Sequence, residues 1–305
     1  MERKHLEWLG VMVFTFVLNS CSSGGEDVPS PTPQPAPVEK KIPINLNCGV
    51  SSRVSDSGYE NNDKVGLYVV NYKDGNVGTL QVSGNHADNV AFTYNGSTWT
   101  SGNSLYWKDD KTKADFYVYY PYGSVTNVTD HPFSVKEDQS SVASYKASEF
   151  LYGMAKGISP TENVVNVITY HSMSCAVIQL IAGDGFSDAA LAAAEILVSL
   201  NGLKTASKVN LQTGEVVAPG DLKQMLPLKE DGTYKAVVVP QTVSADNFIS
   251  IVIDGREYKL AEENFTFVSG KRHSFSVTVS KVSNGVNVSI GAWDEDEVDH
   301  GGTAM

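Results

Sequence analysis

Apolar and polar residues alternate strictly in the first ordered stretch of this chain. Ile42, Ile44, Leu46, Cys48 and Val50 are separated by proline, asparagine and glycine. A period of two is typical of a β-strand with one buried face. We therefore expect these five side chains to form the core-facing side of the first strand.

The same pattern recurs along the rest of the chain, and turn-forming dipeptides interrupt it. Strands are predicted at Val65–Tyr72, Thr79–Val82, Val90–Tyr94, Ala114–Tyr120, Val164–Tyr170, Cys175–Ala182, Ile196–Leu200, Tyr234–Val239, Phe248–Ile253, Arg256–Leu260, Ser274–Val282 and Val286–Ile290. The turn signals are Asp74-Gly75, Asn95-Gly96, Asp254-Gly255 and Asn284-Gly285. Many short strands joined by tight turns predict an all-β protein built of sandwiches or barrels.

One alanine-rich segment, Ser187–Leu200, departs from this pattern. Ser187 is a suitable N-cap, which predicts a short helix at 188–194. Ile196, Leu197 and Val198 are consecutive and partly β-branched, so we expect a strand to follow the helix.

Breaks in the alternation divide the chain into four parts. Gly157, Pro160 and Asn163 interrupt it near the middle, which predicts an N-terminal β-domain at 42–160 and a C-terminal β-domain at 161–305. Residues 21–41 are rich in proline and predict a stiff tether, in which 17 residues of polyproline II span roughly 50 Å. Residues 1–20 precede the tether.

The first 20 residues predict a lipoprotein signal peptide. Trp8 to Leu18 is an apolar run of eleven residues, too short for a helix that spans a membrane. Leu18-Asn19-Ser20-Cys21 closes it with leucine at −3 and a small residue at −1, the order of a bacterial lipobox. Cys21 is thus predicted to carry lipid, which would hold the protein to a membrane outside the cytoplasm.

The net charge bears on the choice of binding partners, and the cysteine content bears on disulfide bonding. The net charge is −12 and no basic run occurs, which argues against nucleic acid as a partner. Cys48 and Cys175 remain if Cys21 is acylated. They could form one disulfide in an oxidising compartment or persist as two small buried thiols, and the second interpretation is favoured.

No motif for catalysis, cofactor binding or metal binding emerges. The six histidines are scattered, and neither a zinc motif, a nucleophile elbow nor a phosphate-binding loop is present. We therefore predict no enzymatic activity, cofactor or metal site. The aromatic residues between Trp99 and Tyr122 could form a sugar-binding platform, but packing within strands is the favoured interpretation.

Taken in order, several short segments resemble the fimbrillin family, the Mfa-like and FimA-like subunits of type V pili. The segments are Ser52-Arg53, Tyr59 to Leu67 (YENNDKVGL), Phe92 to Gly96 (FTYNG) with Trp99, Tyr106-Trp107, Ala114 to Pro121 (ADFYVYYP), Asp138-Gln139-Ser140, Glu149 to Gly153 (EFLYG), Ile168 to Ser174 (ITYHSMS) and Trp293. The resemblance implies two transthyretin-like β-sandwiches in tandem, export as a lipoprotein, and cleavage by a trypsin-like protease after an arginine in the first-strand region. Strand exchange with other pilus subunits would follow.

The residues around Arg53 fit this expectation. Arg53 is the first basic residue after Lys41, and it lies in a polar stretch directly after the alternating strand. A cut between Arg53 and Val54 would release lipid, tether and strand together and expose an apolar groove. We expect every sheet edge to be paired while the strand is in place.

The sequence therefore predicts a subunit of a surface fimbrium on the outer membrane that supports adhesion. Its place as stalk, anchor or tip stays open. The alternative is a surface lipoprotein or tip adhesin that binds a host glycan or protein without polymerising.

The lipid anchor is testable by substitution. Cys21→Ala should abolish incorporation of radiolabelled palmitate and retention on the membrane, because acyl chains are the only strong membrane-binding element predicted. Equal labelling of the Cys21→Ala protein would contradict the prediction.

Overall fold

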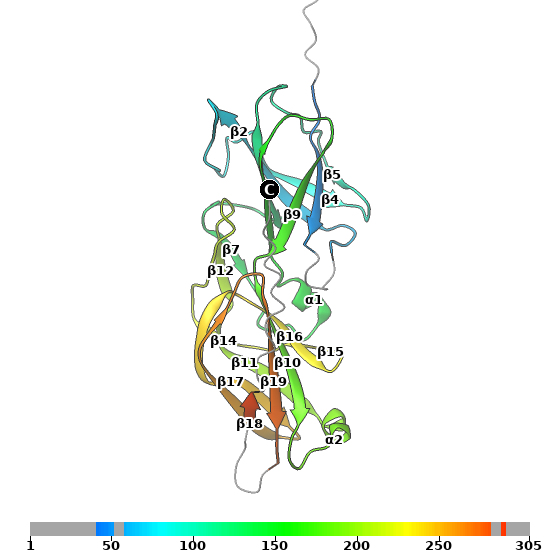
Figure 1. Cartoon of the computed structure of the whole chain (residues 1–305), viewed down its shortest axis with the longest axis vertical. Coiled ribbons are helices and arrows are strands. Elements are labelled where there is room, and N and C mark those ends of the chain that lie inside the picture. The colour runs from blue at the N-terminus through cyan, green and yellow to red at the C-terminus, as the bar shows by residue number, and fades with distance from the viewer. Residues whose placement is uncertain (1–40, 52–57, 282–287, 291–305) are drawn as a thin grey trace, which may run out of the picture. The chain divides into compact units, whose positions relative to one another are not determined.

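Nearly every regular element of the structure is a β-strand, as the alternation predicts (Figure 1). The computed structural model describes residues 41–51, 58–281 and 288–290. Two short helices accompany the strands within this range, α1 (Val142–Lys146) and α2 (Asp188–Ala193). The described residues lie in a compact unit that begins at Lys41. The protein is all-β, whereas its division into two transthyretin-like domains at residues 160 and 161 stays a prediction.

The first sheet contains eight strands and begins with the strand that the alternation predicts. Seven of them follow the spatial order β1 (Asn45–Val50), β9 (Val164–His171), β8 (Leu151–Ile158), β6 (Ala114–Tyr120), β2 (Lys64–Lys73), β4 (Ala87–Tyr94) and β5 (Trp99–Ser101). The eighth, β3 (Asn76–Val77), pairs with β2 off this path. β9 lies beyond residue 160 in the chain and still belongs to this sheet, between β1 and β8.

Three further sheets follow. The five-stranded sheet has the order β15 (Leu228–Glu230), β16 (Thr233–Val238), β10 (Ser174–Ala182), β19 (Arg272–Val279) and β20 (Val288–Ile290). The four-stranded sheet has the order β14 (Leu222–Met225), β11 (Ile196–Lys204), β17 (Gln241–Ile253) and β18 (Arg256–Phe267). The three-stranded sheet has the order β13 (Val216–Val217), β12 (Ala206–Val209) and β7 (His131–Ser134).

The middle strands of the first sheet are buried on both faces. In β2, Val65, Leu67 and Val69 pack into one apolar cluster together with the side chains of β1. Tyr68 and Val70, which point the other way, pack into a second cluster shared with the other sheets. The alternation along β2 thus divides its side chains between two cores.

Two predicted hairpins and the helix are confirmed. Asp74-Gly75 joins β2 to β3 and Asp254-Gly255 joins β17 to β18, each with positive φ at both residues, as a two-residue hairpin turn requires. Ser187 caps α2 by accepting a hydrogen bond from Ala190 N, and β11 follows directly.

The prediction of a strand at Thr79–Val82 is wrong. This stretch is a loop, in which Asn85 accepts from Gln81 N at 3.1 Å and donates to Gln81 O at 2.7 Å. Leu80 is buried nonetheless, so the apolar pattern marked a core contact and not a strand.

Gln139 extends the hydrogen-bonded network of the five-stranded sheet by means of its side chain. It is fully buried, and its amide nitrogen donates to Val237 O at 2.8 Å while its amide oxygen accepts from Val237 N at 2.8 Å. Val237 pairs with Cys175 of β10 on its other side. The Gln139 amide therefore takes the place of a neighbouring strand beside β16.

Replacing Gln139 should be costly. Gln139→Ala leaves the buried N–H and C=O of Val237 without their partners, and should lower the free energy of unfolding by about 2–4 kcal/mol. Chemical denaturation measures this. Gln179→Ala, at an exposed glutamine of β10, is the matched control and should change little. A loss below about 1 kcal/mol for Gln139→Ala would contradict the assignment.

Candidate functional site at the first strand

β1 is an edge strand held by a parallel ladder to β9. Its register runs from Asn45 opposite Val164 to Val50 opposite Thr169. In Figure 1 the blue β1 lies beside the green β9. These strands are more than a hundred residues apart in the chain, so β1 is joined to its place by packing and not by a local turn.

The predicted alternation of β1 is visible in its burial. Ile44, Leu46 and Cys48 are each only 5% exposed and lie in the core cluster of the first sheet. Ile42 packs against this cluster and is half-buried, as is Val50. The intervening Asn45, Asn47 and Gly49 are exposed. Leu46, Cys48 and Val50 thus come from β1, and Ile42 and Ile44 from the residues just before it; the middle three of the five are buried most deeply.

Two tryptophans hold the edge of β1 that faces away from β9. Trp99 Nε1 donates to Cys48 O at 3.0 Å, and Trp107 N donates to Ile42 O at 2.9 Å. Ile44 N donates to Leu105 O at 2.8 Å. Both tryptophans are buried, so at these positions the aromatic cluster packs the core, as favoured from the sequence, and does not form an open platform.

The expectation that every edge is paired while β1 is in place is wrong. Among the described residues, β1 ends the strand order of its sheet and forms a ladder with β9 alone. The bonds of Leu105 and Trp107 form a single antiparallel bridge between Pro43 and Tyr106, just before β1. Trp99 contacts the other edge of β1 at Cys48 O.

Thr169 ties together the two ends of the segment that contains Arg53. It accepts from Ser51 N at 2.9 Å through its carbonyl, and its hydroxyl donates to Gly49 O at 3.1 Å. The hydroxyl of Tyr59 lies 2.8 Å from Thr169 Oγ1. Burial raises the pKa of Tyr59, so this phenol stays protonated and can donate to Thr169. The flanks of residues 52–57 therefore meet at one residue of β9.

Cys48 and Cys175 are not joined by a disulfide in this structure. Cys48 lies in β1 and Cys175 in β10, strands of two different sheets. The prediction of two buried thiols is confirmed for Cys48, whereas Cys175 is only half-buried. Burial raises the pKa of Cys48 to about 12.

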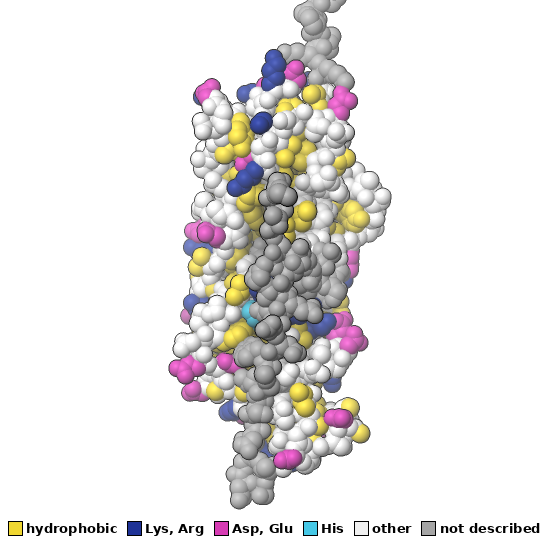
Figure 2. Space-filling view, in the orientation of Figure 1, with side chains coloured by type: hydrophobic (Ala, Val, Ile, Leu, Met, Phe, Trp, Pro, Cys, Tyr) yellow, Lys and Arg dark blue, Asp and Glu magenta, His cyan; other side chains and the backbone are white. Residues whose placement is uncertain are grey.

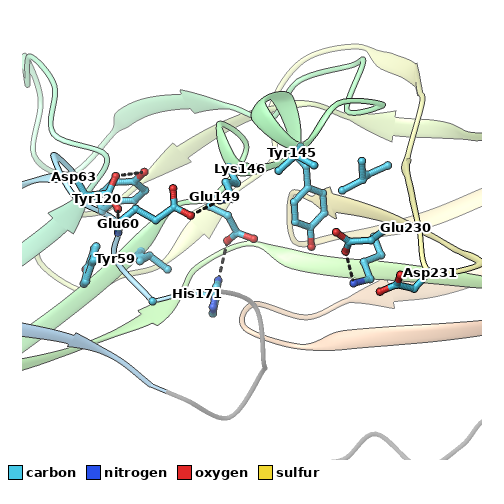
Figure 3. Close-up of a pocket in the computed structure, with 15 residues that line it drawn as sticks. Tyr59, Glu60, Asp63, Tyr120, Tyr145, Lys146, Glu149, His171, Glu230 and Asp231 are labelled. Carbon is cyan, nitrogen blue, oxygen red and sulfur yellow. Dashed lines mark hydrogen bonds and ion pairs between the residues drawn. The ribbon is translucent and has the colours of Figure 1, made fainter. Parts of the chain in front are cut away.

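A cavity of about 550 Å³ lies beside Tyr59 (Figure 3). Its charged side chains pair with one another. Lys146 of α1 binds Glu60, His171 Nδ1 lies 2.7 Å from Glu149 Oε2, and Lys235 lies 3.0 Å from Glu230. Asp63 accepts from Tyr120 OH at 3.1 Å and from Glu60 N at 2.7 Å. These pairs fix the turn after residue 58 against α1 and the end of β9.

The other predicted site residues lie outside the described part of the chain. These are Cys21 and the proposed cleavage pair, Arg53 and Val54. Within the described ranges, no three potential ligand side chains come together to hold a metal ion, and no helix is long and apolar enough to cross a membrane. Acidic and basic side chains are scattered over the face shown in Figure 2 without a large basic patch.

Comparison with known proteins identifies the family. The family model described as "Fimbrillin-like" matches residues 52–293, most of the chain. The protein belongs to the fimbrillin-like family, as the sequence resemblance suggested.

Individual relatives agree with this assignment. The chain is 27% identical over 300 residues to a protein of Bacteroides uniformis named "Putative fimbrium subunit Fim1C", covering 92% of this chain and 93% of that one. Crystal structures of a "putative cell adhesion protein" from Bacteroides uniformis (TM-score 0.60, 22% identity, covering 82% of this chain and 97% of that chain) and from Bacteroides ovatus (TM-score 0.65, 16% identity, covering 86% and 99%) share its fold.

The burial of Cys48 is testable through its reactivity. A raised pKa and a closed core both suppress the thiolate, so iodoacetamide should modify Cys48 at pH 8 at least about a hundredfold more slowly than an exposed thiol. The protein would carry Cys21→Ala and Cys175→Ala, leaving Cys48 as the only thiol. The control moves the thiol to the exposed neighbour through Asn47→Cys with Cys48→Ala. Similar rates for the two proteins would show that β1 does not stay docked.

Proposed function

We propose that this protein is a structural or accessory subunit of a surface fimbrium. In this proposal β1 is a removable strand, and a strand from a neighbouring subunit later takes its place. Cys21 anchors the exported precursor to the outer membrane. A trypsin-like protease cuts between Arg53 and Val54, and strand exchange with other subunits follows. The observation that carries the proposal is β1 itself, an edge strand whose apolar face is part of the core.

The geometry of β1 suits release in one piece. Its ladder runs to β9 alone, and its chain connection onward passes through residues 52–57, whose two flanks both bond to Thr169. A cut in this segment would leave Tyr59 and the turn that follows in place, because Glu60 and Asp63 are held by Lys146 and Tyr120. The groove would then open while the rest of the sheet stays intact.

An empty groove would be unstable. Five apolar side chains at roughly 1.5–3 kcal/mol each correspond to a gross burial term on the order of 10 kcal/mol before entropic costs. A strand from another subunit could recover this term and pair with the open edge of β9. Such a joint would be long-lived.

The arrangement of the C-terminal strands favours one candidate for the donor strand. β19 pairs with β10 on one side and β20 on the other, and Phe275, Val277 and Val279 are fully buried, so it cannot leave without breaking its sheet. β20 lies at the sheet edge and pairs with β19 at three positions. Since Val286, Val288 and Ile290 alternate as the residues of β1 do, we assign the donor to the segment around β20 and not to β19.

A fimbrial subunit needs no catalytic centre, and membership of a structural family supports the prediction that the protein is not an enzyme. Its partners would be other fimbrial subunits, the outer membrane through the lipid, and the processing protease.

Cleavage at Arg53 is the step to test. Brief treatment of the purified full chain with low-dose trypsin should cut after Arg53 and lead to ladders that resist SDS. Arg53→Ala should abolish both results, because no other basic residue lies between Lys41 and Lys64. The control is Lys40→Ala with Lys41→Ala, which blocks cutting within the tether and should leave the ladders unchanged.

Two outcomes would contradict the proposal. Normal assembly of the Arg53→Ala protein would exclude a role for this cut. Clean cleavage that leaves a stable monomer at high protein concentration would indicate a static binder or a tip adhesin instead, with a host glycan or protein as its partner.

A further inference from the structure

The outward edge of β1 has a gap in its hydrogen bonding. In a β-strand, the N–H and C=O of alternate residues point to the same side. Ile44 N and Cys48 O point away from β9, towards Leu105 and Trp99. Leu46 lies between them, so its main-chain N–H and C=O point the same way, and no ladder within the described residues covers this edge.

A cavity of about 590 Å³ opens beside this gap. It is lined by the first half of β1, by β5 and the turn before it, and by the start of β9. The lining includes Leu46, Thr98, Trp99, Thr100, Ser104 and Leu105. Its floor is apolar and its rim carries hydroxyl groups, a combination that suits an extended peptide. Thr100 and Ser104 are exposed on this rim.

We propose that this cavity is a landing site for the incoming strand of a second copy of the protein, occupied while β1 is still in place. The open edge at Leu46 offers main-chain groups, which another main chain satisfies best. The cavity is continuous with the groove that β1 fills, so a strand docked there is beside the positions it will occupy. This inference rests on the proposed function.

The contact of Trp99 with Cys48 sets the order in which the incoming strand pairs with the residues of β1. The docked strand pairs first with Leu46, at the gap. It then competes with Trp99 for Cys48 O and advances along β1 as β1 leaves. Exchange by this route never exposes the whole groove to water, which would cost the burial term estimated above.

Filling the cavity tests the site. Thr100→Trp places a bulky side chain in the cavity from an exposed position, so the core and the final joint stay unchanged. It should slow the formation of SDS-resistant ladders after cleavage at least tenfold and leave the final extent unaltered. Thr126→Trp, at an exposed threonine outside the cavity, is the matched control and should assemble at the original rate. Equal rates for the two variants would overturn the proposal.

A second measurement separates docking from exchange. A synthetic peptide of residues 283–293 is added to the uncleaved Arg53→Ala protein, in which β1 cannot leave. The peptide should slow hydrogen exchange at the Leu46 amide, and Thr100→Trp should remove this protection. No protection of Leu46, with ladders still forming in the cleaved wild-type chain, would overturn the landing site and leave the proposed function standing. Protection without any ladders would refute the proposed function and leave the peptide site intact.

Discussion

The apolar core of the first sheet depends on β1, which lies at the edge of that sheet. Ile44, Leu46 and Cys48 pack into the apolar cluster of the first sheet, yet within the described residues β1 has a ladder on one side alone. The position of β1 and the residues just before it rests on apolar burial, the register with β9, hydrogen bonds donated by Trp99 and Trp107, and one accepted by Leu105. Such an arrangement is what the proposed exchange for a strand of similar pattern requires.

The surrounding structure is braced separately from β1. Gln139 replaces a strand beside Val237, and α1 binds the turn after residue 58 through Lys146 and Glu60. The middle strands of the first sheet pack into two cores, so the loss of β1 removes side chains from one of them only. If β1 is exchanged as proposed, this separation would let the rest of the protein stay folded.

Local alternation predicted most of the strands, and the β1 side chains among them, because a half-buried strand repeats every two residues. It missed β8, whose Gly153 weakens the pattern. A Cβ at Gly153 would lie 2.2 Å from Ile168 O, so the glycine is required by the close approach of β9. Local alternation could not reveal that β1 pairs with β9 in parallel or that the outer edge of β1 is open, since both depend on contacts between distant segments. The pairing of Gln139 with Val237 was hidden for the same reason.

The central claim is that β1 is removed when the subunit joins a fimbrium, and the N-terminus of the native protein tests it most directly. N-terminal sequencing and intact mass measurement would be applied to subunits isolated from fimbriae on the native cell surface. The account predicts chains that begin at Val54 and lack lipid. Assembled subunits that begin at an acylated Cys21 and retain Ile42–Val50 would contradict it.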